Sequence, residues 1–323
     1  MKRFLIKCFG LIAASVVLSV VLCVLLFKLN PPGLDGYQQG FIYQMDALEK
    51  LDLEKPRLIF IGGSYLTFSM DGRLAAKSFD LPVRILGTHS GMGMSYVFEM
   101  AARHLRKGDV VVFPFDAFRE RYYGMPLIYL AIGGRYDLLA DFAFEHPFEI
   151  LRSAPSFCTQ RLLNRFSPRP LLLPSINEAT MPDAAYSARW FDKRTGYYEL
   201  RRDSVWRPEK LKVLHDFDIS KIRLGCIDEV NEFNEICKSK GASLLIAFPP
   251  LLKDSVSACA EQVAKYESFL SEKLNAPIIS HTADNFYSAA DIFDNPSHLT
   301  SEGSRSYTIR LLKNIRVWQA SAK

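Results

Sequence analysis

The chain has 323 residues, of which 49% are hydrophobic, and a formal net charge of +5. Residues 1–28 contain four positive residues and no negative one, which leaves a net charge of +1 for residues 29–323. This nearly neutral remainder argues against a nucleic-acid partner, because nucleic-acid-binding domains concentrate positive charge. Its length fits one large α/β domain or a domain with an insertion.

An uncharged apolar segment runs from Cys8 to Phe27, between Lys7 and Lys28. As a helix that rises about 1.5 Å per residue, it is roughly 30 Å long, which matches one hydrocarbon core. The alternative is a cleaved signal peptide, whose apolar region is usually about 7–15 residues long and ends in a small-x-small site. This segment is longer and ends in bulky residues, so we expect residues 1–28 to form a cytoplasmic tip and one uncleaved transmembrane helix. The preceding positive residues predict an inside N-terminus.

Residues 29–55 are expected to form a linker and a leading helix, and residues 56–323 the main domain. Apolar runs read as buried strands at residues 57–61, 82–86, 110–113, 243–248 and 277–279. Helical patterns follow at residues 96–106, 219–240, 257–273 and 300–317, and Gly241 is placed to end the second of them. This alternation is typical of a parallel sheet that helices cover on both faces, with ligands beyond the carboxyl ends of its strands.

The alternation stops between residues 122 and 208, where the chain is rich in aromatic residues and interrupted by prolines. We interpret this stretch as an insertion or cap over the strand ends, with helical pieces near residues 137–144 and 148–151. Its aromatic side chains either stack on sugar rings or form the core of the cap, and both interpretations stay open. Six of them lie close together in the sequence: Tyr186, Trp190, Phe191, Tyr197, Tyr198 and Trp206.

The cysteines do not form a metal-binding or redox motif, since the sequence has no CxxC pair and no Cys/His metal spacing. Cys226 and Cys237 share one predicted helix and lie about 16 Å apart along it, too far for a disulfide. We therefore expect buried free thiols, while a disulfide that involves Cys158 or Cys259 stays open. Neither a metal nor a cofactor is expected. Residues 91–93, Gly-x-Gly, also lack the third glycine of a dinucleotide-binding loop.

Ser64 follows Gly62 and Gly63 at the end of the first predicted strand. The glycines permit a sharp turn and a close backbone approach, so the hydroxyl can project into a cleft with its own N–H directed at an oxyanion. A serine hydroxyl becomes an effective nucleophile when a neighbouring imidazole removes its proton. The alternative is an ordinary helix N-cap, for which serine is a preferred residue.

A matching imidazole occurs far downstream in Asp294-Asn295-Pro296-Ser297-His298. A carboxylate beside an imidazole fixes its tautomer and stabilises its positive charge. Pro296 stiffens this loop, which can bend Asp294 back to His298. The alternative is an ordinary turn that carries a surface histidine.

Together these segments resemble the SGNH (GDSL-like) hydrolase superfamily. Residues 60–64, Phe-Ile-Gly-Gly-Ser, are similar to its first block, and residues 294–303 to its final Asp/His block. The longer Asp294–His298 spacing resembles the Asp-x-Pro-x-His-Leu form of a membrane-anchored bacterial branch. Residues 89–94 and 106–111 resemble a glycine-rich stretch and a Lys-x-Gly-Asp-x-Val-Val strand of that branch.

The resemblance implies a three-layer α/β/α flavodoxin-like fold with a parallel sheet. It implies Ser64 as nucleophile, His298 as general base and Asp294 as the carboxylate that orients it. The N–H groups of Ser64 and Gly91 would stabilise the oxyanion. The superfamily also supplies an asparagine to the oxyanion from its third block, whereas residues 113–116 here are Phe-Pro-Phe-Asp. The loss of one such donor costs about 10²–10³ in rate.

Anchored proteins of this branch resemble partners in the acylation of cell-envelope polymers. The resemblance thus implies an enzyme on the outer side of a bacterial cytoplasmic membrane, which transfers or removes an acyl group, most simply acetyl, on an envelope glycan. An integral-membrane acyltransferase would be its partner, and substrate contacts would come from His89, Trp190, Tyr197 and Tyr198. The alternative is a catalytically silent glycan-binding subunit, which the absent asparagine supports and the complete Ser64, Asp294 and His298 set opposes.

Overall fold

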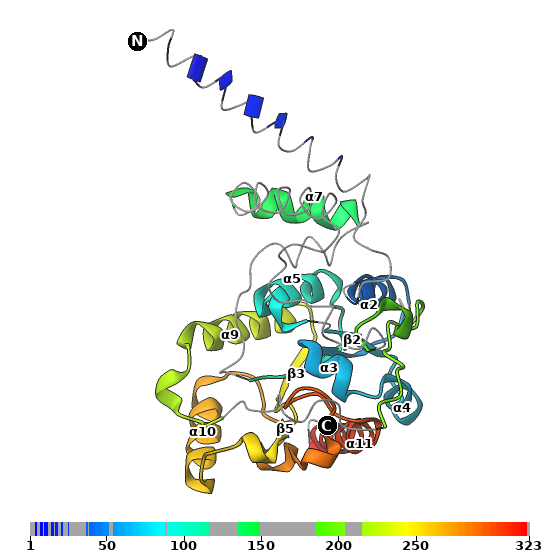
Figure 1. Ribbon diagram of the computed structural model, residues 1–323, viewed down its shortest axis with the longest axis vertical. Coiled ribbons are helices and arrows are strands. Elements are labelled where there is room, and N and C mark those ends of the chain that lie inside the picture. Colours follow the sequence, from blue (N-terminus) through cyan, green and yellow to red (C-terminus); the bar gives the residue numbers. More distant parts are fainter. Residues whose placement is uncertain are drawn as a thin grey trace, which may run out of the picture. The chain divides into compact units, whose positions relative to one another are not determined.

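The computed structural model describes residues 37, 39–51, 54–87, 89–116, 135–148, 185–203 and 215–321, with some positions between residues 4 and 25 (Figure 1). The chain divides into two compact units. The first comprises residues 1–42 and 124–189, and the second residues 43–123 and 190–323. Residues 190–203, which we expected in the insertion, therefore lie in the same unit as the strands.

The first unit contains α7 (Tyr136–Glu145), which confirms the helix expected near residues 137–144. The α2 helix (Gln39–Lys50) spans the boundary between the units and matches the predicted leading helix. Most of the predicted anchor lies outside the described residues. Among the positions that are described, no helix has the length and apolar character needed to cross a membrane.

The second unit is built on a parallel sheet with the strand order β2-β1-β3-β4. Its strands are β1 (Leu58–Ile61), β2 (Val83–Leu86), β3 (Val110–Pro114) and β4 (Ser243–Ala247). All four were predicted, and their side chains are almost entirely buried, as a sheet covered on both faces requires. The fifth predicted strand, residues 277–279, is reduced to a parallel bridge between Ile278 and Ile246.

Helices cover both faces of this sheet (Figure 1). On one face lie α5 (Met94–His104) and α9 (Leu224–Ser239), whose Phe98 and Phe233 rings stack with centroids 4.2 Å apart. The other face carries α3 (Ser64–Ser69), α4 (Gly72–Ser78) and α11 (Ser301–Ser321), which share one hydrophobic core with alternate strand residues. The α/β architecture with helices on both faces is therefore as predicted.

The helix boundaries differ from the predicted ones in places. A 3-10 turn (Ile219–Lys221) precedes α9, and the Asp218 side chain caps it by accepting the Ser220 N–H. Extended backbone at Ile222 and Arg223 separates this turn from α9. Gly241 follows α9 with φ +69, and the next N–H donates back to the Cys237 carbonyl, so the predicted helix end is confirmed. The last long crossover helix, α10, covers Ala260–Lys273. A second, two-stranded sheet of β5 (Leu251–Leu252) and β6 (Phe286–Tyr287) was not predicted.

A buried ion pair joins the amino ends of β1 and β3. Arg57 and Asp109 precede these strands, and both side chains are fully buried. Arg57 Nη2 lies 2.6 Å from Asp109 Oδ2, and Arg57 Nη1 donates to the Leu48 carbonyl at 2.7 Å. Asp109 also accepts the backbone N–H of Arg57 at 2.8 Å. Asp109 is the aspartate of the segment that resembles a Lys-x-Gly-Asp-x-Val-Val strand. It is thus a structural residue, at the opposite end of the sheet from Ser64.

The described cysteines are free thiols, and no disulfide occurs among them. Cys226 and Cys237 are buried as expected, while Cys259 is exposed. Burial raises the pKa of the Cys237 thiol to about 12, so it stays protonated near neutral pH. Cys158 lies outside the described residues, and its pairing stays a prediction.

Candidate active site

Ser64 is the first residue of α3, immediately after the turn that leaves β1. The N-cap residue is Gly63, so the Ser64 side chain does not cap the helix. Gly62 is required by packing, because a Cβ on it would lie 2.6 Å from the Tyr65 hydroxyl, which donates to the Pro114 carbonyl. The backbone N–H of Ser64 has no acceptor within its own helix, as is usual in a first turn.

The Asp294–His298 segment forms a tight loop. The backbone N–H of His298 donates to the Asn295 carbonyl at 2.8 Å, and the Phe293 N–H donates to the His298 carbonyl at 2.7 Å. These bonds bring the Asp294 carboxylate to the imidazole, with Oδ1 2.8 Å from His298 Nδ1. Both side chains are only 5% exposed, so this is not a turn with a surface histidine.

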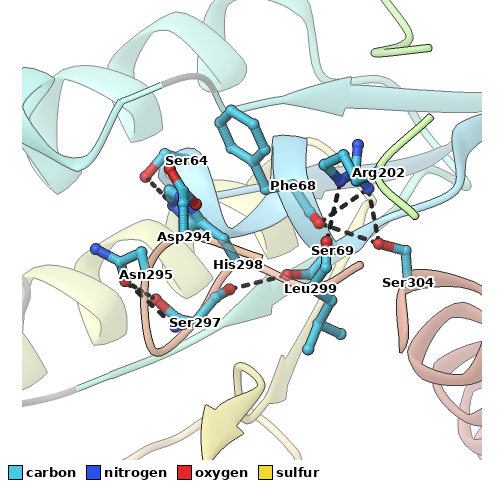
Figure 2. Close-up of polar contacts among 10 residues, drawn as sticks. All are labelled: Ser64, Phe68, Ser69, Arg202, Asp294, Asn295, Ser297, His298, Leu299 and Ser304. Atoms are coloured by element: carbon cyan, nitrogen blue, oxygen red, sulfur yellow. Dashed lines mark hydrogen bonds and ion pairs between the residues drawn. The ribbon is translucent and has the colours of Figure 1, made fainter. Parts of the chain in front are cut away.

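Two contacts from other elements fasten this loop to the α/β unit. The Ser69 hydroxyl, at the end of α3, donates to the Ser297 carbonyl at 2.9 Å (Figure 2). The Leu252 N–H of β5 donates to the Pro296 carbonyl at 2.7 Å. The loop is therefore tied to the helix that begins with Ser64.

A continuous hydrogen-bonded chain connects Ser64, His298 and Asp294 (Figure 2). His298 Nε2 lies 3.0 Å from Ser64 Oγ, although the two residues are 234 positions apart. Since Asp294 can only accept, Nδ1 carries the proton of a neutral ring, which leaves Nε2 free to accept from the serine hydroxyl. These distances suit a nucleophile, its general base and an orienting carboxylate.

Phe68 fixes the plane of the His298 ring. The two rings stack with centroids 4.4 Å apart and an interplanar angle of 16°. Phe68 lies one helical turn after Ser64, so α3 supplies both the hydroxyl and the surface that supports the imidazole. The Arg202 guanidinium lies 5.7 Å from the Phe68 ring centroid and 5.3 Å from that of Tyr198.

Arg202 ties together the backbone around the site. Its Nε donates to the Leu299 carbonyl at 3.0 Å, and its Nη2 to the Phe68 carbonyl at 3.1 Å and the Ser304 hydroxyl at 2.8 Å (Figure 2). It is buried, so these carbonyls have little access to water. Neither Arg202 nor Phe68 could be expected from the sequence, since neither belongs to a motif with a recognisable spacing.

Replacement of Arg202 with methionine is expected to lower the free energy of unfolding by about 3 kcal/mol. Each buried carbonyl that loses its donor costs about 1–3 kcal/mol. The matched control is Arg201→Met, because the adjacent Arg201 side chain is 83% exposed and pairs with Asp203. Urea unfolding of both variants measures the difference, and equal stabilities would contradict the role of Arg202.

The predicted residues His89 and Gly91 contact each other. The Gly91 N–H donates to His89 Nδ1 at 2.8 Å, so this N–H is engaged by a side chain. His89 lines a small cavity with Gly62 and Gly63 at the carboxyl end of β1. The oxyanion role of Gly91 and the substrate contact of His89 stay predictions.

The aromatic residues that were predicted to contact the substrate differ in exposure. Tyr197 is buried in the core, and its hydroxyl donates to the Val83 carbonyl at 2.7 Å. Tyr198 is buried against Phe68, with ring centroids 4.9 Å apart, and burial raises the pKa of its hydroxyl. Trp190 is half-buried. Tyr197 and Tyr198 are thus buried in the unit that contains the sheet and do not form the core of a separate cap, as one of the two interpretations expected, while Trp206 lies outside the described residues.

Two solved structures are similar to this chain. Protein YxiM from Bacillus subtilis has 8% sequence identity and a TM-score of 0.35, and the match covers 82% of this chain but 57% of that one. A structure described as a platelet activating factor from Streptococcus pneumonia has 9% identity and the same TM-score, with 85% and 91% covered.

No family model matches the chain, and no curated protein matches it. The assignment of chemistry therefore rests on the geometry of the chain's own residues.

Proposed function

We propose that this protein is a serine esterase or O-acyltransferase that works through an acyl-serine intermediate. The hydrogen-bonded chain from Ser64 through His298 to Asp294 supports this proposal. An activated serine needs a base within hydrogen-bond reach, and the base needs a third group to orient it. The burial of His298 and Asp294 strengthens their interaction, because water does not screen it.

The reaction follows from these positions. Ser64 Oγ attacks the acyl carbonyl carbon while its proton moves to His298 Nε2, and Asp294 stabilises the resulting imidazolium. When the tetrahedral intermediate collapses, the alcohol leaves with the proton from His298, and the acyl group stays on Ser64. In the second half, His298 takes a proton from water or from an acceptor hydroxyl, whose oxygen attacks the acyl carbonyl carbon. The bond between the acyl group and Ser64 Oγ then breaks, and His298 returns the proton to Ser64 Oγ. Water gives hydrolysis, and a sugar hydroxyl gives transfer.

The finer proposal is an enzyme anchored in a bacterial cytoplasmic membrane that acts outside it on a cell-envelope glycan, with acetyl as the acyl group. Its support is the apolar segment Cys8–Phe27, the positive residues that precede it, and the motif resemblance. An anchor holds the enzyme near an integral-membrane acyl donor, which raises the effective concentration of one partner for the other. This advantage favours transfer over free hydrolysis.

The test compares the purified full chain with its Ser64→Ala variant on p-nitrophenyl acetate, with and without envelope oligosaccharides as acceptors. We expect nitrophenol release by the wild type only, and acetylated oligosaccharide in the mass spectrum when an acceptor is present. Release without acetylated product would assign the protein to hydrolysis. A wild type that binds oligosaccharide but matches Ser64→Ala in release would instead support the silent binding subunit.

A further inference from the structure

Attack by Ser64 turns the carbonyl oxygen into an oxyanion, which needs preorganised hydrogen-bond donors. The Ser64 N–H at the start of α3 is one donor. The residues that follow β3, Phe115 and Asp116, are buried and carry no N–H donor in their side chains. A second donor near Ser64 can come from the end of a neighbouring strand. β2 pairs with β1 in parallel and ends at the same edge of the sheet.

His89 lies just beyond β2, and its ring has a defined tautomer. The Gly91 N–H donates to His89 Nδ1 at 2.8 Å, so Nδ1 is the unprotonated nitrogen. A neutral imidazole then carries its proton on Nε2, where it is a donor. Among the described residues, no group accepts a hydrogen bond from this Nε2. The ring thus presents an N–H that is available to a ligand.

His89 lies beside a small cavity near the start of α3. Together with Gly62 and Gly63, which immediately precede Ser64, it lines a cavity of about 10 Å³. That volume is close to the space of one water molecule. Burial lowers the pKa of His89, and a positive charge on His298 lowers it further. The two rings therefore interact electrostatically, and His89 stays neutral while His298 carries the proton from Ser64.

We propose that the Nε2–H of His89 is a hydrogen-bond donor to the oxyanion, with Gly91 positioning the ring through its own N–H. This inference rests on the proposed serine chemistry and names a further catalytic residue for it. It also gives the Gly91 N–H a different task from direct contact with the oxyanion. The oxyanion would be held by the Ser64 N–H on one side and by His89 on the other.

Steady-state kinetics on p-nitrophenyl acetate test the role of His89. His89→Ala is expected to lower kcat by about 10²–10³, the usual effect of losing one oxyanion donor, with little change in KM. His89→Gln keeps a side-chain N–H and is expected to recover part of this loss. The matched control, His281→Ala, changes an exposed histidine paired with Glu267 and should leave kcat unchanged. Thermal unfolding of each variant confirms that the fold is retained.

A second measurement does not depend on turnover. Ring nitrogen NMR of the resting protein should show His89 protonated on Nε2 alone, and phenylboronic acid, which forms a tetrahedral adduct with an activated serine, should bind His89→Ala more weakly than wild type. A proton on Nδ1, or equal kcat in wild type and His89→Ala, would overturn the His89 inference and leave the serine chemistry standing. Equal inactivity of wild type and Ser64→Ala would overturn both.

Discussion

Replacement of His298 with glutamine is expected to lower kcat for ester cleavage by about 10⁴–10⁶. The serine and its general base work together, so loss of the base removes nearly all of the rate enhancement that the pair provides. In the wild type, Ser64 Oγ lies 3.0 Å from the imidazole of His298. Glutamine retains polar atoms near Ser64 Oγ, but it cannot accept the serine proton at neutral pH. The measurement is kcat on p-nitrophenyl acetate at saturating substrate.

Two further variants make this prediction specific. Asp294→Asn should cost about 10⁴, since an amide in place of the carboxylate favours the wrong imidazole tautomer. His281→Gln is the matched control, because this histidine is exposed and lies outside the site. Its kcat should equal that of the wild type. Comparable kcat values for His298→Gln and His281→Gln would contradict the role of His298 as base.

Replacement of Asp109 with alanine is expected to lower the free energy of unfolding by about 3–5 kcal/mol. The variant leaves the Arg57 guanidinium buried without its carboxylate, and an uncompensated buried charge carries a cost of this size. The measurement is urea unfolding of the full chain, with the slope checked for two-state behaviour.

The matched control is Asp203→Ala, which removes the partner of exposed Arg201 and should cost about 0–1 kcal/mol. If Asp109→Ala does not fold, the double variant Arg57→Met/Asp109→Leu provides the comparison. This variant removes the uncompensated charge but leaves the Leu48 carbonyl and the Arg57 N–H without their partners, so we expect it to be less stable than the wild type and still to fold. Equal free energies of unfolding for Asp109→Ala and Asp203→Ala would contradict this account of the ion pair. So would a double variant that does not fold when Asp109→Ala does.

The sheet could be predicted because its strands are short apolar runs bounded by turn residues. Residues 58–61 and 110–113 are buried on both faces, and strands of this kind have sequences that are unbroken hydrophobic runs. The bridge at Ile278 and the paired strands β5 and β6 depend on only two or three residues each. Segments this short have no periodicity, so tertiary packing decides their conformation.

The proximity of Ser64 to His298 could be predicted because both lie at boundaries that the sequence marks. Ser64 ends a strand, and His298 precedes a helix. Arg202 and Phe68 could not be predicted in the same way, because they meet through the packing of chain segments 134 residues apart. The direction of the Gly91 N–H depends on backbone angles in a 3-10 turn (Ser90–Met92), which composition does not determine.

Reaction of the full-length protein with a fluorophosphonate probe tests the activated serine most directly. A serine hydroxyl reacts with such a probe when a neighbouring base removes its proton and fluoride leaves the phosphorus. We predict one probe adduct on the wild-type protein, located by peptide mass spectrometry at Ser64, and none on Ser64→Ala. Equal labelling of the two proteins, or none of either, would contradict the claim that His298 and Asp294 activate Ser64.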